Sequence, residues 1–310
     1  MLINALLGFI QALLLLLLTP LFTGISRKLR ARIQTRKGAP ILQDYYDLAK
    51  LFSRQEMVTK NAGPIFKWMP AIYLGSYFAI AMGLPLLTAN SPIPFLADVI
   101  TIIYLLAVPR FFFALASIDS SSSFAGVGGV RELIVSTLVE PGMMLSLIVV
   151  ALLAGTTSIT EISIMNLTGN IPALMAFVVA GIAFAYCTYI ELGKLPYDLA
   201  EAEQELQEGP LTEYSGASLA FLKLGMGMKQ LVMLGLFIAI FLPFGASLDG
   251  SFISVLLAIV ILLVKILVIF FIVGIIENVV ARVRFANASH QIWVSLGIAS
   301  LAFVFLIVGI

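Results

Sequence analysis

Eight long apolar stretches dominate this chain, and each approaches the roughly 20 residues that an α-helix needs to cross the hydrocarbon core of a membrane. They cover residues 3–25, 70–88, 99–118, 132–154, 172–192, 230–247, 253–277 and 292–310. Charged residues make up only 11% of the chain, whereas a soluble globular domain carries about 25%. The sequence therefore predicts an all-α, polytopic membrane helix bundle of about eight transmembrane helices. Residues 1–310 would form a single integral membrane domain.

Lysine and arginine are confined almost entirely to alternate connections between these stretches. Sixteen of the 18 lie in the connections 26–69, 119–131, 193–229 and 278–291, and the three other connections contain none. Because basic connections remain on the cytoplasmic side of a membrane, we expect these four to be cytoplasmic. An even number of spans then places both termini in the periplasm. The expected location is the inner (cytoplasmic) membrane of a bacterium or archaeon, as a multi-pass protein.

The cytoplasmic connection 26–69 carries ten basic and three acidic residues. After a turn at 38–40, apolar residues recur at helical spacing from Ile41 to Phe52, which predicts an amphipathic helix at the membrane surface. Two compatible interpretations follow: the basic residues orient the protein and bind lipid headgroups, or the segment docks a soluble partner. The docking hypothesis includes Arg27, Arg30, Arg32, Arg36, Lys37, Asp47 and Lys50, with Arg131, Tyr214, Arg282 and Arg284 from other parts of the chain.

The cytoplasmic connection 193–229 is negative, with six acidic and three basic residues. A helix beginning near Asp198 would gather four carboxylates within about 80° around its axis and would end at Gly209-Pro210. Because like charges this close repel one another, the stripe is either a solvated face or a proton-conducting array beneath a soluble partner. The stripe would comprise Asp198, Glu201, Glu205 and Glu208, and Glu203 and Glu213 complete the acidic set.

Ionisable residues inside membrane spans are costly and mark functional positions by default. Glu140 lies about 12 Å into its span at 1.5 Å per residue, and Lys265 lies near the middle of the seventh span. We expect both to lie on a polar path, with Glu191 and Glu277 at the cytoplasmic ends of the fifth and seventh spans. Arg110 is close enough to the cytoplasmic end for its long side chain to snorkel to the surface. The pattern favours a proton relay over catalytic acids that act on bonds.

The residue content excludes several kinds of active site. With one cysteine, Cys187, and one histidine, His290, the chain cannot build a disulfide framework, a cysteine-ligated iron–sulfur site or a metal centre of its own. The sequence has no phosphate-binding glycine loop and no nucleophile–base pair, and nothing beyond the basic connection suggests nucleic-acid binding. We therefore expect no catalytic, cofactor-binding or metal-binding residue in this chain.

Two of the connections resemble those of subunit 1 of respiratory Complex I. The acidic connection resembles the family's third cytoplasmic loop through Pro196–Leu199, Glu201, Glu203, Glu205, Leu206, Gly209 and Glu213–Gly216. The basic connection is similar to the family's first loop through Arg36, Gly38, Pro40, Gln43, Asp47, Lys50 and Leu51. Arg131 and Glu140 match an arginine and a glutamate of the fourth span. Tyr197 replaces the family's phenylalanine, and Ala39 is inserted before the proline.

Within this superfamily, the chain most resembles the membrane subunits of membrane-bound nickel–iron hydrogenases, the branch of formate hydrogenlyase and hydrogenase-4 component C. The segments that carry this resemblance are 191–216, 109–113 and 281–285. Residues 287–289 are Asn-Ala-Ser, where the quinone-reducing branch has an acidic pattern. Residues 118–124 lack the glycine and proline that the hydrogenase branch has in this segment.

The resemblance implies a membrane anchor and coupling subunit, which docks a hydrophilic electron-transfer arm and links it to proton or ion translocation. The implied partners are the large and small hydrogenase subunits, iron–sulfur subunits and an antiporter-like membrane subunit, besides the lipid bilayer. These partners, and not this chain, would carry the nickel–iron and iron–sulfur clusters. The proton path would comprise Glu140, Glu191, Asp198, Glu201, Glu203, Glu205, Glu208, Glu213, Glu277 and Lys265.

Three alternatives remain open from the sequence. The chain could be the quinone-binding subunit of a Complex I-type NADH dehydrogenase. It could be a self-sufficient ion transporter, although no paired half-spans broken by glycine or proline are visible. It could also be a purely structural membrane anchor whose carboxylates are idle.

Overall fold

The computed structural model of the chain describes residues 2–199, 203–248 and 251–309. Within these residues, eight helices are long and apolar enough to cross a membrane, which confirms the predicted number of spans. They are α1 (Leu2–Ile33), α3 (Pro64–Gly83), α4 (Val99–Asp119), α5 (Ser123–Ala154), α7 (Leu174–Glu191), α9 (Gly216–Phe241), α10 (Phe252–Val279) and α11 (Phe285–Val308). The shorter elements are α2 (Gln43–Phe52), η1 (Pro94–Ala97), α6 (Ile159–Thr168), α8 (Glu203–Leu206) and η2 (Gly209–Glu213).

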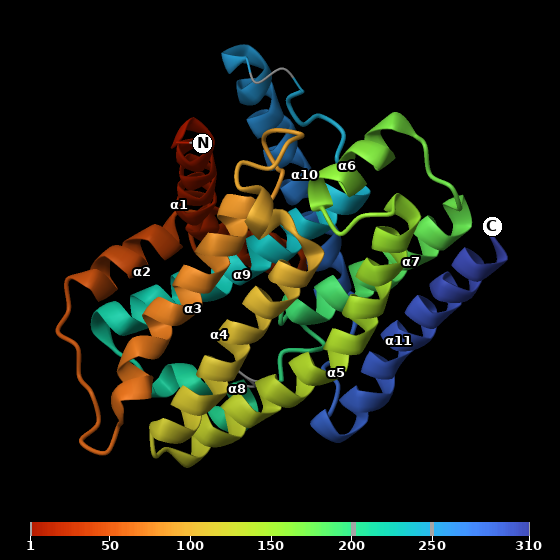
Figure 1. Cartoon of the computed structure of the whole chain (residues 1–310). Helices are drawn as coiled ribbons and strands as arrows, with labels where there is room; N and C mark the ends of the chain where they lie inside the picture. Colours follow the sequence, from red (N-terminus) through yellow and green to blue (C-terminus); the bar gives the residue numbers. More distant parts are fainter. Residues whose placement is uncertain (1, 200–202, 249–250, 310) are drawn as a thin grey trace.

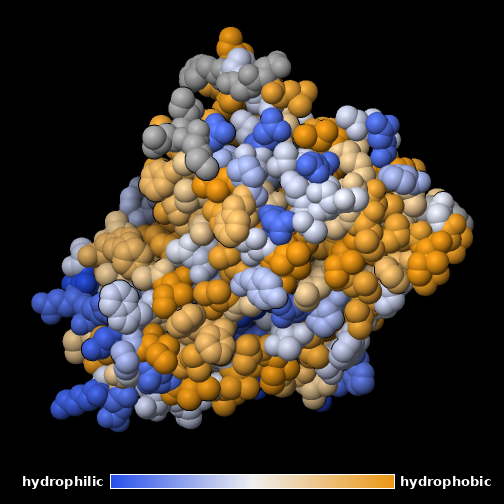
Figure 2. Space-filling view, in the orientation of Figure 1, coloured by the Kyte–Doolittle hydropathy of each residue, from blue (hydrophilic) through white to orange (hydrophobic). Residues whose placement is uncertain are grey.

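Helix α9 lies at the centre of the bundle (Figure 1). It packs against α1, α3 and α7, while α5 joins α4, α7 and α11 into a second packed group. The most apolar 18-residue segment of α9 is 72% buried, whereas the corresponding segments of α10 and α11 are each 22% buried. The two peripheral helices therefore present broad apolar faces outward, and Figure 2 shows apolar side chains over much of the molecular surface. Such a surface suits lipid or neighbouring membrane subunits.

The connections 34–63, 192–215 and 280–284 meet at one end of the bundle. The Ser215 hydroxyl donates to the Met57 carbonyl over 2.9 Å, and Arg282 donates to Asp198 over 2.6 Å. Hydrophilic side chains project at the lower left of Figure 2, where Figure 1 places the orange segment that joins α2 to α3. We call this end the basic side. Its cytoplasmic orientation remains a prediction from the charge distribution.

The amphipathic helix predicted in the first connection is present as α2, which begins at Gln43, two residues after Ile41. Its Asp44 accepts a hydrogen bond from Thr23 over 2.7 Å and pairs with Arg27 at 2.8 Å. Tyr45 donates to the Leu17 carbonyl over 2.6 Å. These three contacts fasten α2 onto α1, so α2 is a fixed part of the basic side.

Several predicted helix boundaries were wrong in the same direction, because the helices extend past their apolar cores on the basic side. Helix α3 begins at Pro64 instead of residue 70, α5 at Ser123 instead of 132, and α9 at Gly216 instead of 230. A hydropathy pattern locates the hydrocarbon core, whereas a helix can continue through polar turns because its backbone hydrogen bonds remain satisfied. The connection 193–229 therefore shortens to 192–215, and Lys229 lies within a span.

The helix predicted to begin near Asp198 and to end at Gly209-Pro210 is present only in part among the described residues: Asp198 and Leu199 are not helical, residues 200–202 lie outside the described residues, and α8 follows. Between α7 and α9, the described residues form only α8 and η2, and Glu208 between them has a left-handed φ of 70°. A helix of this length is marginal on its own, so the burial of apolar side chains decides the path. The side chains that hold this connection against the bundle are the buried Leu199, Leu206 and Leu211.

Candidate functional site: a buried ion cluster

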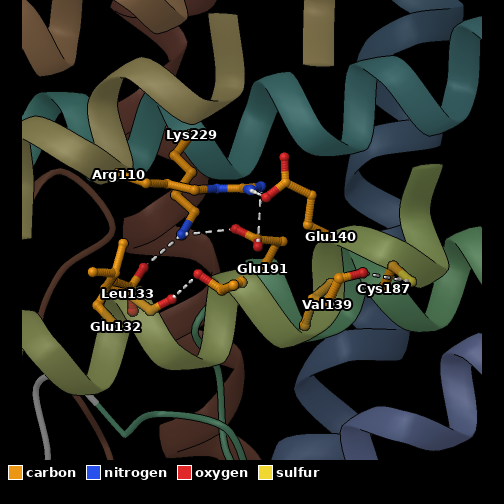
Figure 3. Close-up of polar contacts among 9 residues, drawn as sticks. Arg110, Glu132, Leu133, Val139, Glu140, Cys187, Glu191 and Lys229 are labelled. Carbon is orange, nitrogen blue, oxygen red and sulfur yellow. Dashed lines mark hydrogen bonds and ion pairs between the residues drawn. The ribbon is translucent and has the colours of Figure 1, made fainter. Parts of the chain in front are cut away.

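Five charged side chains from four helices meet inside the bundle (Figure 3). They are Arg110 of α4, Glu132 and Glu140 of α5, Glu191 of α7 and Lys229 of α9. We call this group the buried ion cluster. Its members come from positions up to 119 residues apart in the sequence, so it exists only because the helices pack together.

Glu191 is at the centre of the cluster, and its side chain is only 1% exposed. One of its carboxylate oxygens lies 3.1 Å from Arg110 Nη2, and the other lies 3.1 Å from Lys229 Nζ. Lys229 also donates to Glu132 over 2.8 Å. Arg110 Nη1 lies 3.9 Å from Glu140, a longer ion pair. Each cation thus bridges Glu191 to a second carboxylate.

The charges in the cluster do not cancel, because two cations face three carboxylates. Buried charges are tolerated only when they are paired, because desolvation costs several kcal/mol per ion. Glu132 and Glu140 are more accessible, with 22% and 29% of their side-chain surface exposed. One added proton would bring the group to neutrality. With all five groups ionised, the cluster therefore carries a net charge of −1.

Several polar atoms of the cluster lack hydrogen-bond partners among the described residues. They are the Nε and both Nη atoms of Arg110 and both carboxylate oxygens of Glu191, whose contacts are ion pairs outside hydrogen-bond geometry. Such atoms usually bind ordered water when space allows. A cavity of about 100 Å³ adjoins Glu132, Glu191 and Lys229 and also reaches Asp198 on the basic side. A water needs only about 10–15 Å³ of such volume, so several waters fit.

Glycines on α9 allow the close helix packing that brings Lys229 to the cluster. A Cβ added at Gly225 would lie 2.7 Å from the Tyr73 ring of α3, and one at Gly227 would lie 2.2 Å from a Thr19 methyl of α1. Any larger residue would move α9 away from α1 and α3. The approach of α9 to these helices, and with it the position of the Lys229 ammonium, therefore depends on these two glycines.

A family model described as NADH dehydrogenase matches residues 5–308. The chain belongs to this family. The membership confirms the family resemblance inferred from the two connections, and it extends over nearly the full length of the chain.

Similarity to individual proteins is also extensive. The chain is 50% identical to hydrogenase-4 component C of Escherichia coli over 97% of this chain and 95% of that protein. It is 43% identical to formate hydrogenlyase subunit 4 of the same organism over 96% of this chain and 97% of that protein. A chain of the membrane-bound sulfane sulfur reductase, an archaeal respiratory membrane complex, matches the fold with a TM-score of 0.85, at 26% identity and 98% coverage of both chains. The protein is a multi-pass membrane protein.

The structure brings only part of the predicted proton path into the cluster. Glu140 and Glu191 are members, whereas Glu277 on α10 is buried apart from them and has no hydrogen bond or ion pair among the described residues. Lys265 also lies elsewhere. It donates to the carbonyls of Leu242, over 2.6 Å, and Phe244, and so binds the backbone just after α9.

The acidic residues of connection 192–215 point to separate partners instead of forming one stripe. Asp198 pairs with Arg282 at 2.6 Å, and Glu205 pairs with Arg131 at 2.5 Å. Glu208 is exposed and Glu213 is half-buried. Glu201 lies outside the described residues, and the side chain of Glu203 is not among those described. Asp198 is the acid of this connection that reaches the cavity beside the cluster.

Most residues of the predicted docking surface are accessible, with one exception. The exposed ones are Arg27, Arg32, Arg36, Lys37, Lys50 and Arg284, and the half-buried ones are Arg30, Asp47, Arg131 and Arg282. Tyr214 is 5% exposed, stacks on Phe66 with ring centres 4.0 Å apart and donates to the Phe66 carbonyl over 2.9 Å. Burial raises the pKa of Tyr214. Tyr214 is thus a packing residue that a docking partner cannot reach.

Sequence reasoning missed three members of the cluster. The expectation that Arg110 snorkels was wrong, because it is 5% exposed and paired inside the bundle. Lys229 is the last residue of the predicted connection 193–229, and Glu132 is the first residue of the predicted span 132–154. A charge balance points to the two cations, because carboxylates placed inside spans require cations and Arg110 and Lys229 lie in largely apolar sequence. The same criterion also selects Lys265, so only the packing assigns the pairs.

Proposed function

We propose that this chain is the membrane anchor and coupling subunit of a membrane-bound hydrogenase complex of the formate hydrogenlyase or hydrogenase-4 type, in the cytoplasmic membrane of a bacterium or archaeon. The two similar Escherichia coli proteins are named as subunits of such systems and match over nearly their whole length. The nickel–iron and iron–sulfur groups would be carried by partner subunits, because this chain has one cysteine and one histidine.

The observation that carries the coupling role is the buried ion cluster together with its cavity toward the basic side. A proton would enter beside Asp198 and pass through the cavity to Glu132 and Glu191. Beyond Glu191, Arg110 contacts both Glu191 and Glu140. Its guanidinium stays protonated, so it would hold the two carboxylates while the proton passes between them through water. Glu132 and Glu140 are eight residues apart on α5, about 12 Å along the helix axis. The cluster would therefore move a proton from the basic side into the membrane domain.

Docking would use the exposed basic residues of the first connection. Arg32 in the last turn of α1, Arg36 and Lys37 just after that helix, and Lys50 of α2 are all exposed. The Arg27–Asp44 ion pair fastens α2 to α1. A partner seated there would also cover connection 192–215, which lies at the same end. A change of charge in that partner would act electrostatically on the cluster, because the distance across the cavity is short and salt screens it poorly.

The proposal is tested with the whole complex in proteoliposomes, by measuring proton movement per hydrogen turned over. Glu140→Gln keeps the side-chain shape and removes its charge, so we expect proton movement to be lost while hydrogen turnover remains. The matched control is Glu161→Gln on α6, which is exposed and outside the cluster. Unchanged proton movement in Glu140→Gln would remove this residue from the path. Purification of the tagged chain without any hydrogenase subunit would reject the anchoring role.

A further inference from the structure

A second cavity, separate from the ion cluster, lies between α7, α9, α10 and α11. Its volume is about 610 Å³. It forms because α10 packs chiefly on α1, whereas α11 packs on α5 and α7. Figure 1 shows the two helices diverging from their connection at the basic side. Protein interiors are normally close-packed, so a space of this size calls for an occupant.

The lining of this cavity is apolar along most of its length. Phe237 of α9 and Ile269 and Val273 of α10 all line it, and none of the described lining residues is Asp, Glu, Lys or Arg. Val268 and Ile272 also line the cavity, yet they are 49% and 51% exposed. The cavity therefore opens sideways onto the surface that faces the hydrocarbon of the membrane.

The end of the cavity at the basic side is polar and uncharged. The hydroxyls of Tyr186 and Tyr197 lie 2.5 Å apart, and Tyr197 donates to the Gln291 side-chain carbonyl over 3.2 Å. Burial and the Tyr186 hydrogen bond raise the pKa of Tyr197, so it remains a neutral donor. The Gln291 carboxamide nitrogen keeps its hydrogens free of partners among the described residues.

One buried donor at the cavity lacks any partner. Thr188 of α7 lines the cavity and is 3% exposed, and its hydroxyl makes no hydrogen bond within the described residues. A buried hydroxyl without a partner costs about 1–3 kcal/mol. The Thr188 hydroxyl therefore calls for an acceptor oxygen on the occupant, and the exposed Gln291 amide is free to donate to a second one. The absence of lining cations disfavours an anionic group at this depth.

We propose that this cavity is a binding site for one membrane phospholipid, whose acyl chain fills the apolar part and whose ester carbonyls accept hydrogen bonds from Thr188 and Gln291. The lining runs from Val268 on α10 to Val280, the residue just after that helix, a length of about 17 Å at 1.5 Å per residue. That length is about one leaflet of a hydrocarbon core roughly 30 Å thick. The charged headgroup would lie outside, near connection 280–284, and the lipid would wedge α10 away from α7.

The test uses the full-length chain in phospholipid nanodiscs that contain a trace of phospholipid with a photoreactive acyl chain. We expect cross-links to concentrate on peptides 185–199 and 265–280, and one phospholipid per chain to survive detergent washing in native mass spectrometry. Val273→Trp fills the cavity and should lower both signals at least about tenfold, because most of the apolar burial is lost. Val264→Trp, on the exposed face of the same helix, should leave both unchanged.

Thr188→Val provides a test that keeps the shape of the site and the fold. Loss of one hydrogen bond should lower retention of the lipid about fivefold, whereas Thr168→Val on exposed α6 should have no effect. Equal cross-linking around the whole membrane belt would overturn the proposal, since it indicates bulk lipid only. Recovery of a stoichiometric isoprenoid quinone instead of phospholipid, or of no retained molecule, would also overturn it. The proposal is independent of the coupling role assigned to the ion cluster.

Discussion

Replacement of Lys229 by methionine is the sharpest test of the buried ion cluster. Lys229 is 7% exposed. The change keeps most of its side-chain volume and removes an ammonium that lies 2.8 Å from Glu132 and 3.1 Å from Glu191. Glu191 would then face Arg110 alone, and the net charge of the cluster would change from −1 to −2. Removing one partner of a buried ion pair costs about 3–5 kcal/mol. We expect the free energy of unfolding to fall by about that amount.

The measurement is equilibrium unfolding of the full-length chain in mixed micelles, followed by circular dichroism as the denaturing detergent is increased. The matched control is Lys223→Met, six residues earlier on the same helix. Lys223 is exposed and makes no ion pair with a described residue, so this change should alter stability by less than about 0.5 kcal/mol. The control separates the burial of Lys229 from any general effect of losing a lysine on α9.

A double-mutant cycle decides whether the cost arises from pairing. Glu191→Gln alone should also be strongly destabilising, because it leaves Lys229 and Arg110 without their shared carboxylate. In the double variant Lys229→Met/Glu191→Gln, the loss in free energy of unfolding should be smaller than the sum of the two single losses by at least about 1 kcal/mol. A Lys229→Met cost below about 1 kcal/mol, or strictly additive changes, would refute the reasoning that these charges are buried and paired.

Three further changes test the packing and hydrogen bonding around the site. Gly142→Ala would place a Cβ 2.6 Å from the Ser295 hydroxyl and should destabilise the chain by about 1–3 kcal/mol through overpacking of α5 on α11. Gly75→Ala, which meets nothing within 4 Å, should instead stabilise it by up to about 1 kcal/mol, and a fall in stability for Gly75→Ala would contradict this account. Tyr214→Phe keeps the stack on Phe66 but loses one buried hydrogen bond, so a loss of about 1 kcal/mol is expected in the same unfolding assay. No measurable change would show that the bond contributes nothing.

The membrane spans could be predicted because each apolar stretch is a local property of the sequence. The start of α9 could not, since Lys229 interrupts the apolar pattern and hydropathy treats a lysine as a sign of water. Its ammonium is compatible with a span only because Glu132 and Glu191 neutralise it, and those residues are 97 and 38 positions away. Periodicity carries no information about such distant partners.

In the acidic connection, the local pattern predicts an arrangement of carboxylates that the described residues do not show. Its spacing predicts a helix with a carboxylate stripe, but Asp198 pairs with Arg282, and Glu205 pairs with Arg131. These partners come from the segment before α11 and from α5, and no local pattern could assign them. The sequence did identify Glu140 and Glu191 as buried candidates, because a carboxylate within an apolar span is conspicuous.

Local composition was sufficient to determine the class of this protein: eight membrane spans, a basic side and carboxylates at membrane depth, because lipid admits few structures besides apolar helices. Tertiary packing alone decided which charges meet, which acids reach the cavity beside the cluster and where α10 leaves space for a lipid. The physical reason is that the two kinds of interaction depend on residues at different distances along the chain. A transfer free energy is set residue by residue, whereas an ion pair or a cavity depends on how close separate helices approach, and small residues such as Gly225 and Gly227 govern that approach.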